Sequence, residues 1–120
     1  MKLQMKRVYD APSPDDGYRI LVDRLWPRGE RKEDIRMQGW EKGVTPSPGL
    51  RTDYHKGIHT FEEFSKLYTE ELNARPEARI FAQEVKGWLE TDNVTLLFAA
   101  KDVEHSHVHV LIDWLKKNME

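Results

Sequence analysis

Residues 21–29, Leu-Val-Asp-Arg-Leu-Trp-Pro-Arg-Gly, join an apolar run to one acid, two arginines and a fixed proline bend. Asp23 can act as a general acid or base when its surroundings tune its pKa. Arg24 and Arg28 can clamp a carboxylate or phosphate through paired N–H groups. Trp26 can stack on a flat ligand beside them. A structural interpretation stands beside this one. Asp23 orients Arg24 or caps a neighbouring loop, Arg24 pairs internally with Asp23 or Asp102, Arg28 is solvated, and Trp26 anchors the loop.

A second polar segment begins at Lys101 and contains three histidines. His105 and His107 are candidates for acid–base chemistry or ligand contact, because imidazole titrates near neutral pH. Lys101, Asp102 and Ser106 are further candidate ligand contacts. The alternative for His107 is a half-buried histidine with its hydrogen bonds satisfied inside the fold.

The same segment raises the question of a metal site. On a helix, His105 and His109 would lie one turn apart on one face, as paired zinc ligands do. The Glu of the metalloprotease arrangement is absent between them, and spacing supplies no third ligand. We therefore assign no metal residue and expect no cofactor, with a histidine-ligated metal enzyme as the weakest alternative.

Composition excludes several classes of function. The 120 residues suit one domain, and 38% hydrophobic with 33% charged residues is typical of a soluble globular chain. A net charge of −2 argues against nucleic acid as a whole-surface partner. The absence of cysteine excludes disulfides, thiolate catalysis and Cys-ligated zinc. No transmembrane run, signal peptide or dinucleotide-binding fingerprint is present, so we expect a cytoplasmic protein without a membrane partner.

The elements that must position these residues can be predicted in part. Strands are expected at 4–9, 18–23 and 94–100, and the last two are continuously apolar, as strands covered on both faces are. Helices are expected at 30–38, from a Thr60/Glu63 capping box, from Pro76, and from Asp102 as N-cap. Residues 39–49 are expected to be a loop, and 50–59 are too polar to assign.

This pattern predicts a single three-layer α/β domain, residues 1–120, with a mainly parallel sheet flanked by helices. Ligands bind at the carboxyl ends of strands in such sheets. Asp23 and Arg24 follow one buried strand, and Lys101 and Asp102 follow another, so we expect the two segments to meet in one site.

The motifs also resemble a known family. Residues 21–29, Pro46-Ser47 with Leu50-Arg51, then Phe64, Tyr68 and Glu71-Leu72, and residues 94–107 (Val-Thr-Leu-Leu-Phe-Ala-Ala-Lys-Asp-Val-Glu-His-Ser-His) closely resemble the YeaO-like proteins of the domain-of-unknown-function family DUF488. The resemblance covers nearly the whole chain. It implies a parallel α/β domain in a bacterial or archaeal cytoplasm and a polar pocket formed by the first and last motifs. It implies no established activity.

The chain departs from the family pattern in several places. Wider relatives carry Cys-His-Arg where Ser106-His107 stands, so Cys-dependent chemistry cannot transfer. YeaO-like proteins have Asn at the position of Ser106, Trp at the position of Phe61, and a His near Lys56. His109 is not part of the pattern.

Three functions fit these residues. The first is a small hydrolase- or lyase-type enzyme without a redox cofactor, acting on a small anionic ligand, nucleotide-like compounds included. Asp23 and His107 would form its acid–base pair, with His105 or Asp102 orienting one of them. The second is a non-catalytic module that binds an anion or a protein partner, and the third is the metal enzyme. The sequence leaves the choice among them, and the oligomeric state, open.

Overall fold

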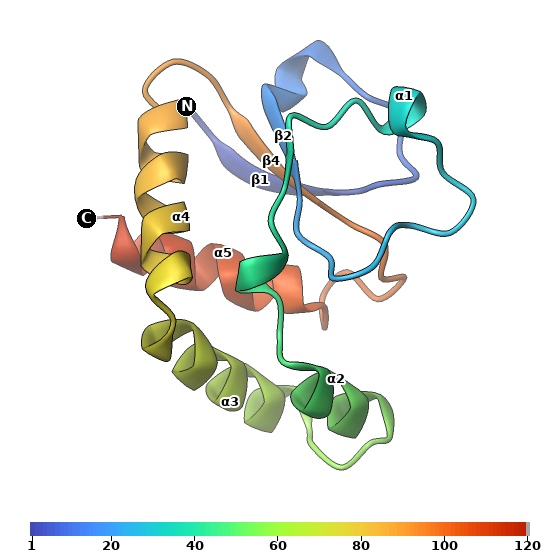
Figure 1. Cartoon of the computed structure of the whole chain (residues 1–120), viewed down its shortest axis with the longest axis vertical. Helices are drawn as coiled ribbons and strands as arrows, with labels where there is room; N and C mark the ends of the chain where they lie inside the picture. The colour runs from blue at the N-terminus through green and yellow to red at the C-terminus, as the bar shows by residue number, and fades with distance from the viewer. Residues whose placement is uncertain (120) are drawn as a thin grey trace.

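The computed structural model describes residues 1–119 and shows an α/β domain (Figure 1). Within these residues, four parallel strands form one sheet in the order β1-β4-β2-β3. The strands are β1 (Leu3–Arg7), β2 (Tyr18–Leu21), β3 (Gly39–Trp40) and β4 (Val94–Phe98). The helices are α1 (Lys32–Ile35), α2 (Pro48–His55), α3 (Phe61–Ala74), α4 (Pro76–Trp88) and α5 (His107–Asn118). The predicted fold class is confirmed.

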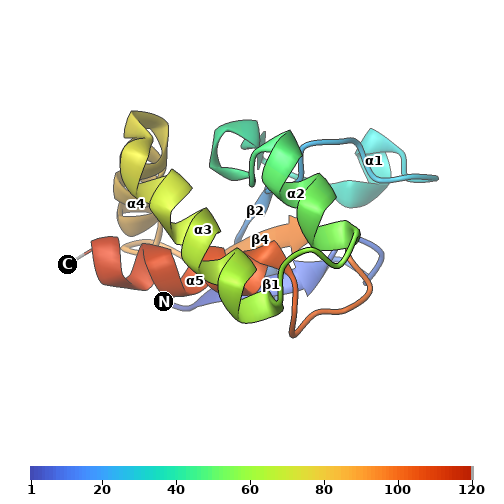
Figure 2. The same ribbon diagram turned by 90° about the horizontal axis from the view of Figure 1, so that it is seen from below.

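Alternate side chains of the two central strands point to opposite faces of the sheet. Ile20 of β2 and Leu96 of β4 pack with the buried faces of α3, α4 and α5 in the larger core. Leu21 and Leu97 pack on the other face with Ile35 and with aromatic side chains of the segment after β2. Both faces are covered, which explains why these strands are continuously apolar. Figures 1 and 2 show α4 and α1 on opposite sides of the sheet.

The layer that contains α1 is tied to the sheet by a buried ion pair. Arg19 pairs with Asp16, and both are 4% exposed. The Arg19 guanidinium also donates to the Ile35 carbonyl through Nε at 3.0 Å and Nη2 at 2.7 Å. This pair lies away from the carboxyl ends of the strands and holds the loop layer against the sheet.

The long helices follow their sequence signals. Thr60 and Glu63 form the predicted capping box at the start of α3, and Pro76 occupies the first turn of α4. Lys116 and Lys117 lie in the last turn of α5, where cations interact favourably with the helix dipole. In residues 1–119, every helix is too short or too polar to cross a membrane.

Three local predictions were wrong or incomplete. Residues 39–49 are not wholly a loop: β3 forms there because Glu41 N donates to Leu21 O at 2.8 Å. Helix α2 begins within the predicted loop, at Pro48, and continues into the unassigned region; the Ser47 N-cap and Pro48 were its available signals. The last helix does not begin at Asp102, because the Asp102 carboxylate accepts from His105 N and closes a separate turn. Ser106 is the N-cap residue of α5 instead.

Candidate functional site

The carboxyl ends of β2 and β4 meet directly. Val22 N donates to Leu97 O at 3.0 Å, which extends the pairing one residue beyond β2. The next residue, Asp23, then accepts a hydrogen bond from Ala99 N on its Oδ2 at 2.8 Å. The Asp23 side chain therefore bridges the two strand ends, where ligands bind in parallel α/β sheets.

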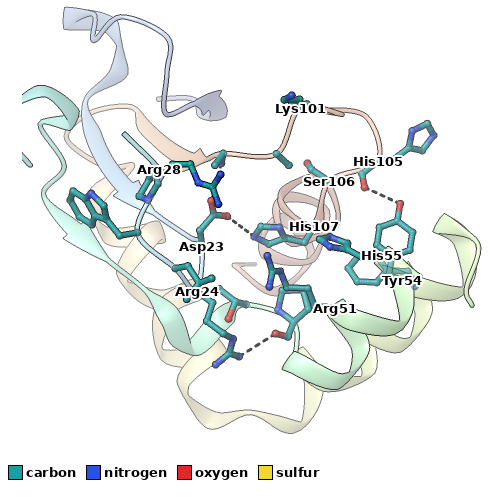
Figure 3. Close-up of a pocket in the computed structure, with 18 of the residues that line it drawn as sticks. Asp23, Arg24, Arg28, Arg51, Tyr54, His55, Lys101, His105, Ser106 and His107 are labelled. Atoms are coloured by element: carbon teal, nitrogen blue, oxygen red, sulfur yellow. Dashed lines mark hydrogen bonds and ion pairs between the residues drawn. The ribbon is translucent and has the colours of Figure 1, made fainter. Parts of the chain in front are cut away.

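His107, the first residue of α5, lies against the same strand ends. Its Nε2 is 2.7 Å from Val22 O and 3.5 Å from Asp23 Oδ1, the contact drawn in Figure 3. A carbonyl oxygen only accepts, so Nε2 carries a proton and donates to Val22. Both Asp23 and His107 have side chains that are 16% exposed.

The pKa values of this pair shift in opposite directions. Burial raises the pKa of Asp23 above its usual value, while His107, Ala99 N–H and Arg51 act to lower it. Burial lowers the pKa of His107, while the Asp23 charge and the bond to Val22 O act to raise it. In both cases desolvation of the charged form is the main cause.

The loop after β2 is held by its two tryptophans. Trp40 Nε1 donates to Asp23 O, and Trp26 Nε1 donates to Glu30 O at 2.8 Å. The two rings meet edge to face with centroids 5.5 Å apart. The indole N–H of Trp26 is thus used within the loop, as the structural interpretation predicted, although its ring still lines the pocket described below.

The two arginines of this loop differ in their surroundings. Arg24 is half-buried and donates from Nη2 to Pro46 O at 3.1 Å, so it does not pair with Asp23 or Asp102. Its Nε is buried and has no acceptor within the described chain. Arg28 is exposed and forms no ion pair in residues 1–119, while its carbonyl accepts from Tyr9 Oη at 3.2 Å.

The segment after β4 is a loop, which corrects the placement of His105. Because α5 begins at His107, His105 precedes the helix and does not share a helical face with His109. Its Nδ1 lies 2.8 Å from Asp102 Oδ2, and both side chains are more than half exposed. Ser106 is buried and its hydroxyl donates to Val103 O at 2.9 Å.

Helix α2 brings in residues that the motif analysis did not assign to the site. Arg51, Tyr54 and His55 line the pocket, and Tyr54 Oη donates to His105 O at 3.1 Å. The helix is fixed at its start by Ser47, whose Oγ accepts from Leu50 N. The polar surface of α2 gave no helical periodicity. Only the Ser47-Pro48 start signal, and the Pro46-Ser47 and Leu50-Arg51 parts of the family resemblance, pointed to this segment.

Together these segments enclose a cavity of about 470 Å³ (Figure 3). Every predicted site residue except Asp102 lines it. The full lining is Tyr9, Asp23, Arg24, Leu25, Trp26, Pro27, Arg28, Thr45, Pro46, Arg51, Tyr54, His55, Phe64, Ala99, Ala100, Lys101, His105, Ser106 and His107. Figure 3 shows Arg28 and Arg51 beside the Asp23–His107 pair, Lys101 on the loop after β4, and the Arg24 guanidinium directed toward Pro46 O.

The described residues offer no cluster of acids and histidines for a metal ion. Across residues 1–119, no three of the His, Asp and Glu side chains are grouped so that they could hold a metal ion. The His105 imidazole pairs with Asp102 and packs against the ring of Phe61. The His107 imidazole is engaged with Val22 and Asp23. The geometry gives the histidine-ligated metal hypothesis no ligand set.

Comparison with known proteins places the chain in a family. The profile of the family described as "Inactive DUF488-N3 subclade" matches residues 2–120. This chain belongs to that DUF488 subclade. The DUF488 chain is 42% identical over 117 residues to "Uncharacterized protein YeaO" of Escherichia coli (strain K12), covering 97% of this chain and 98% of the relative.

A second relative has a similar sequence identity to this chain. "Uncharacterized protein Rv3073c" of Mycobacterium tuberculosis (strain ATCC 25618 / H37Rv) is 40% identical over 114 residues, covering 95% of this chain and 93% of the relative. No solved structure matches this DUF488 chain. The YeaO-like resemblance drawn from the motifs is confirmed.

Proposed function

We propose that this protein binds a small anionic molecule in the pocket at the carboxyl ends of β2 and β4 and releases it unchanged. The observation that carries the proposal is the charge of the lining. Arg24, Arg28, Arg51 and Lys101 contribute four cations, against the single carboxylate of Asp23. None of the four forms an ion pair in residues 1–119.

The hydrogen bonds of Asp23 and His107 support binding rather than turnover. Asp23 Oδ2 accepts from Ala99 N, and the His107 Nε2 proton is donated to Val22 O. Each group therefore has a structural task that joins β2, β4 and α5. The family description contains the word "Inactive", which agrees with a site that binds without chemistry.

Titration calorimetry with inorganic phosphate and with benzoate tests the proposal. We expect saturable binding that weakens as salt is added, because the arginines are partly solvated. Arg51→Gln removes an exposed cation and should lower the affinity at least tenfold, since a hydrogen bond to a charged group contributes about 1.5–3 kcal/mol and about 1.4 kcal/mol is tenfold. Arg79→Gln, an exposed arginine of α4 outside the pocket, is the matched control and should have no effect.

The recovered ligand decides between binding and catalysis. Bound and released anion should be identical by NMR after prolonged incubation. The proposed anion site would be contradicted if neither inorganic phosphate nor benzoate bound saturably. Equal affinities of the wild type and Arg51→Gln would also contradict it. Formation of a product would contradict release without turnover.

A hydrolase- or lyase-type enzyme is the second candidate, favoured by the 3.5 Å contact between Asp23 and His107 and by their opposed pKa shifts. Pairs of titratable groups with such shifts are common at catalytic centres. In this case Asp23→Asn would abolish turnover while the protein stays folded. Turnover of any phosphate ester or nucleotide by the wild type, lost in this variant, would establish the enzyme.

A further inference from the structure

The pocket carries more positive charge than one monoanion would neutralise. Its lining has an excess of three positive charges when Asp23 is ionised and the histidines are neutral. Asp102, the nearest other acid in the chain after β4, lies outside the lining and is engaged with His105. A ligand with one negative charge would leave most of this excess uncompensated.

The lining also supplies more N–H donors than one carboxylate can accept. Arg24 Nε is a buried donor without an acceptor, and a buried unpaired donor is costly. Arg28, Arg51 and Lys101 are exposed side chains with no hydrogen bond to the described residues. A carboxylate has two oxygens, whereas a phosphomonoester has three terminal oxygens and a charge of about −1.5 to −2 at pH 7.

The cavity is larger than its cationic part needs. Its volume of about 470 Å³ lies within the range of sites for small organic ligands. Leu25, Trp26 and Pro27 form an apolar part of the lining, and Leu25 is 64% exposed. An exposed leucine beside an indole ring offers contact area to an apolar group attached to the anion.

Resting on the proposed anion-binding function, we infer that the ligand is a phosphomonoester dianion carrying an apolar or aromatic group. Arg24, Arg28, Arg51 and Lys101 bind the phosphate, and the Leu25-Trp26-Pro27 segment contacts the organic group. Charge distinguishes this ligand from a phosphodiester or a carboxylate of similar shape, because each of those carries one negative charge.

Three probes with the same ring test this inference by calorimetry at pH 7.5. They are phenyl phosphate, methyl phenyl phosphate and benzoate, which are a monoester dianion, a diester monoanion and a carboxylate. We expect phenyl phosphate to bind at least tenfold more tightly than either monoanion. We also expect it to bind more tightly than inorganic phosphate, since inorganic phosphate lacks the ring.

Two variants separate the parts of the ligand. Arg51→Gln should reduce the preference for the monoester over the diester, while Arg79→Gln should leave it unchanged. Leu25→Ser should weaken phenyl phosphate severalfold without changing the affinity for inorganic phosphate. Both Leu25 and Arg51 are exposed, so the folded state should tolerate these changes.

The outcomes distinguish the failure of each proposal. If the three ring probes bind within threefold of one another, the dianion inference is wrong and the anion site stands. If only inorganic phosphate binds, the apolar contact is wrong. If no probe binds saturably, the dianion inference and the proposed function fail together.

Discussion

His107 donates from Nε2 to the carbonyl of Val22, 85 positions away in the chain, at 2.7 Å. This bond attaches the first turn of α5 to the residue that follows β2, next to the pocket-lining Asp23. Asp23, the residue after Val22, lies 3.5 Å from the same nitrogen and accepts from Ala99 N. Asp23 and His107, whose side chains suit acid–base catalysis, therefore also connect β2, β4 and α5.

The Asp23→Asn variant should bind an anionic ligand more tightly than the wild type. Asparagine keeps an oxygen that can accept from Ala99 N, while the only carboxylate of the lining disappears. A like charge about 4 Å from a bound anion costs about 1 kcal/mol in bulk water and more near a protein surface, so its removal should tighten binding roughly fivefold or more. Calorimetry should therefore show tighter binding of phenyl phosphate, and weaker binding would mean that Asp23 contacts the ligand productively.

The free energy of unfolding should depend on pH through the lowered pKa of His107. Its pKa is lowered in the folded state, so below the unfolded value of about 6.5 the unfolded chain binds more protons. The free energy of unfolding should consequently fall as the pH drops from 7.5 to 5.5. The raised pKa of Asp23 acts in the opposite direction, from the pKa of its folded state down to its unfolded value of about 3.9.

Urea denaturation of the His107→Gln variant isolates this contribution. Glutamine can still donate to Val22 O but does not titrate. Its unfolding free energy should therefore fall less than that of the wild type over the same pH interval. Equal slopes for the two proteins would show that other histidines produce the dependence.

Much of the fold could be predicted from local signals. The runs at 18–23 and 94–100 identified the two central strands because both of their faces are buried, and the Thr60/Glu63 box identified the start of α3. Helix α2 and strand β3 could not be predicted in this way. α2 buries Leu50 alone, and a strand of two residues is too short to show alternation.

Part of the candidate pocket could be predicted from where its residues stand in the chain relative to the strands. Residues that follow parallel strands lie at the same edge of the sheet, and because β2 and β4 are neighbours, Asp23 and Lys101 line one pocket. The bond from His107 to Val22 depends on how α5 docks, and no local pattern encodes it. Arg51 was missed for a similar reason, because its helix reaches the pocket through long-range contacts between Ser47 and Glu71.

Tyr68 provides a test of the core beneath the pocket. Its hydroxyl is fully buried and donates to Val44 O, and burial raises its pKa far above the usual value. Tyr68→Phe should leave the Val44 carbonyl unpaired and reduce the free energy of unfolding by about 1–3 kcal/mol. Tyr54→Phe, which removes a more exposed bond to His105 O, is the control in urea denaturation and should cost less.

Gly17 and Gly87 should respond to alanine in opposite directions. Gly17 has φ +62°, and a Cβ there would lie 2.1 Å from Asn93 O, so the turn before β2 would have to move. Gly17→Ala should cost about 2 kcal/mol or more, since both backbone strain and a steric clash oppose it.

Gly87 lies in α4 with nothing near its Cβ position, and Gly87→Ala should stabilise the protein by about 0.5–1 kcal/mol. Chemical denaturation of both variants checks the pair, and a neutral Gly17→Ala would show that the turn can take up another conformation.

Ser47 links the start of α2 to α3 through Glu71. Ser47 N and Oγ both donate to the Glu71 carboxylate, and Arg75 Nη2 lies 3.2 Å from the same group. Ser47→Ala removes the N-cap and should cost about 1 kcal/mol. Because Arg51 lies one turn after Ser47, the variant should also bind phenyl phosphate several times more weakly.

Thr60→Ala, which removes the N-cap of α3 outside the pocket lining, is the matched control. It should lower the free energy of unfolding by a similar amount and leave the affinity for phenyl phosphate unchanged. An equal loss of affinity in both variants would mean that stability, and not the position of Arg51, controls binding.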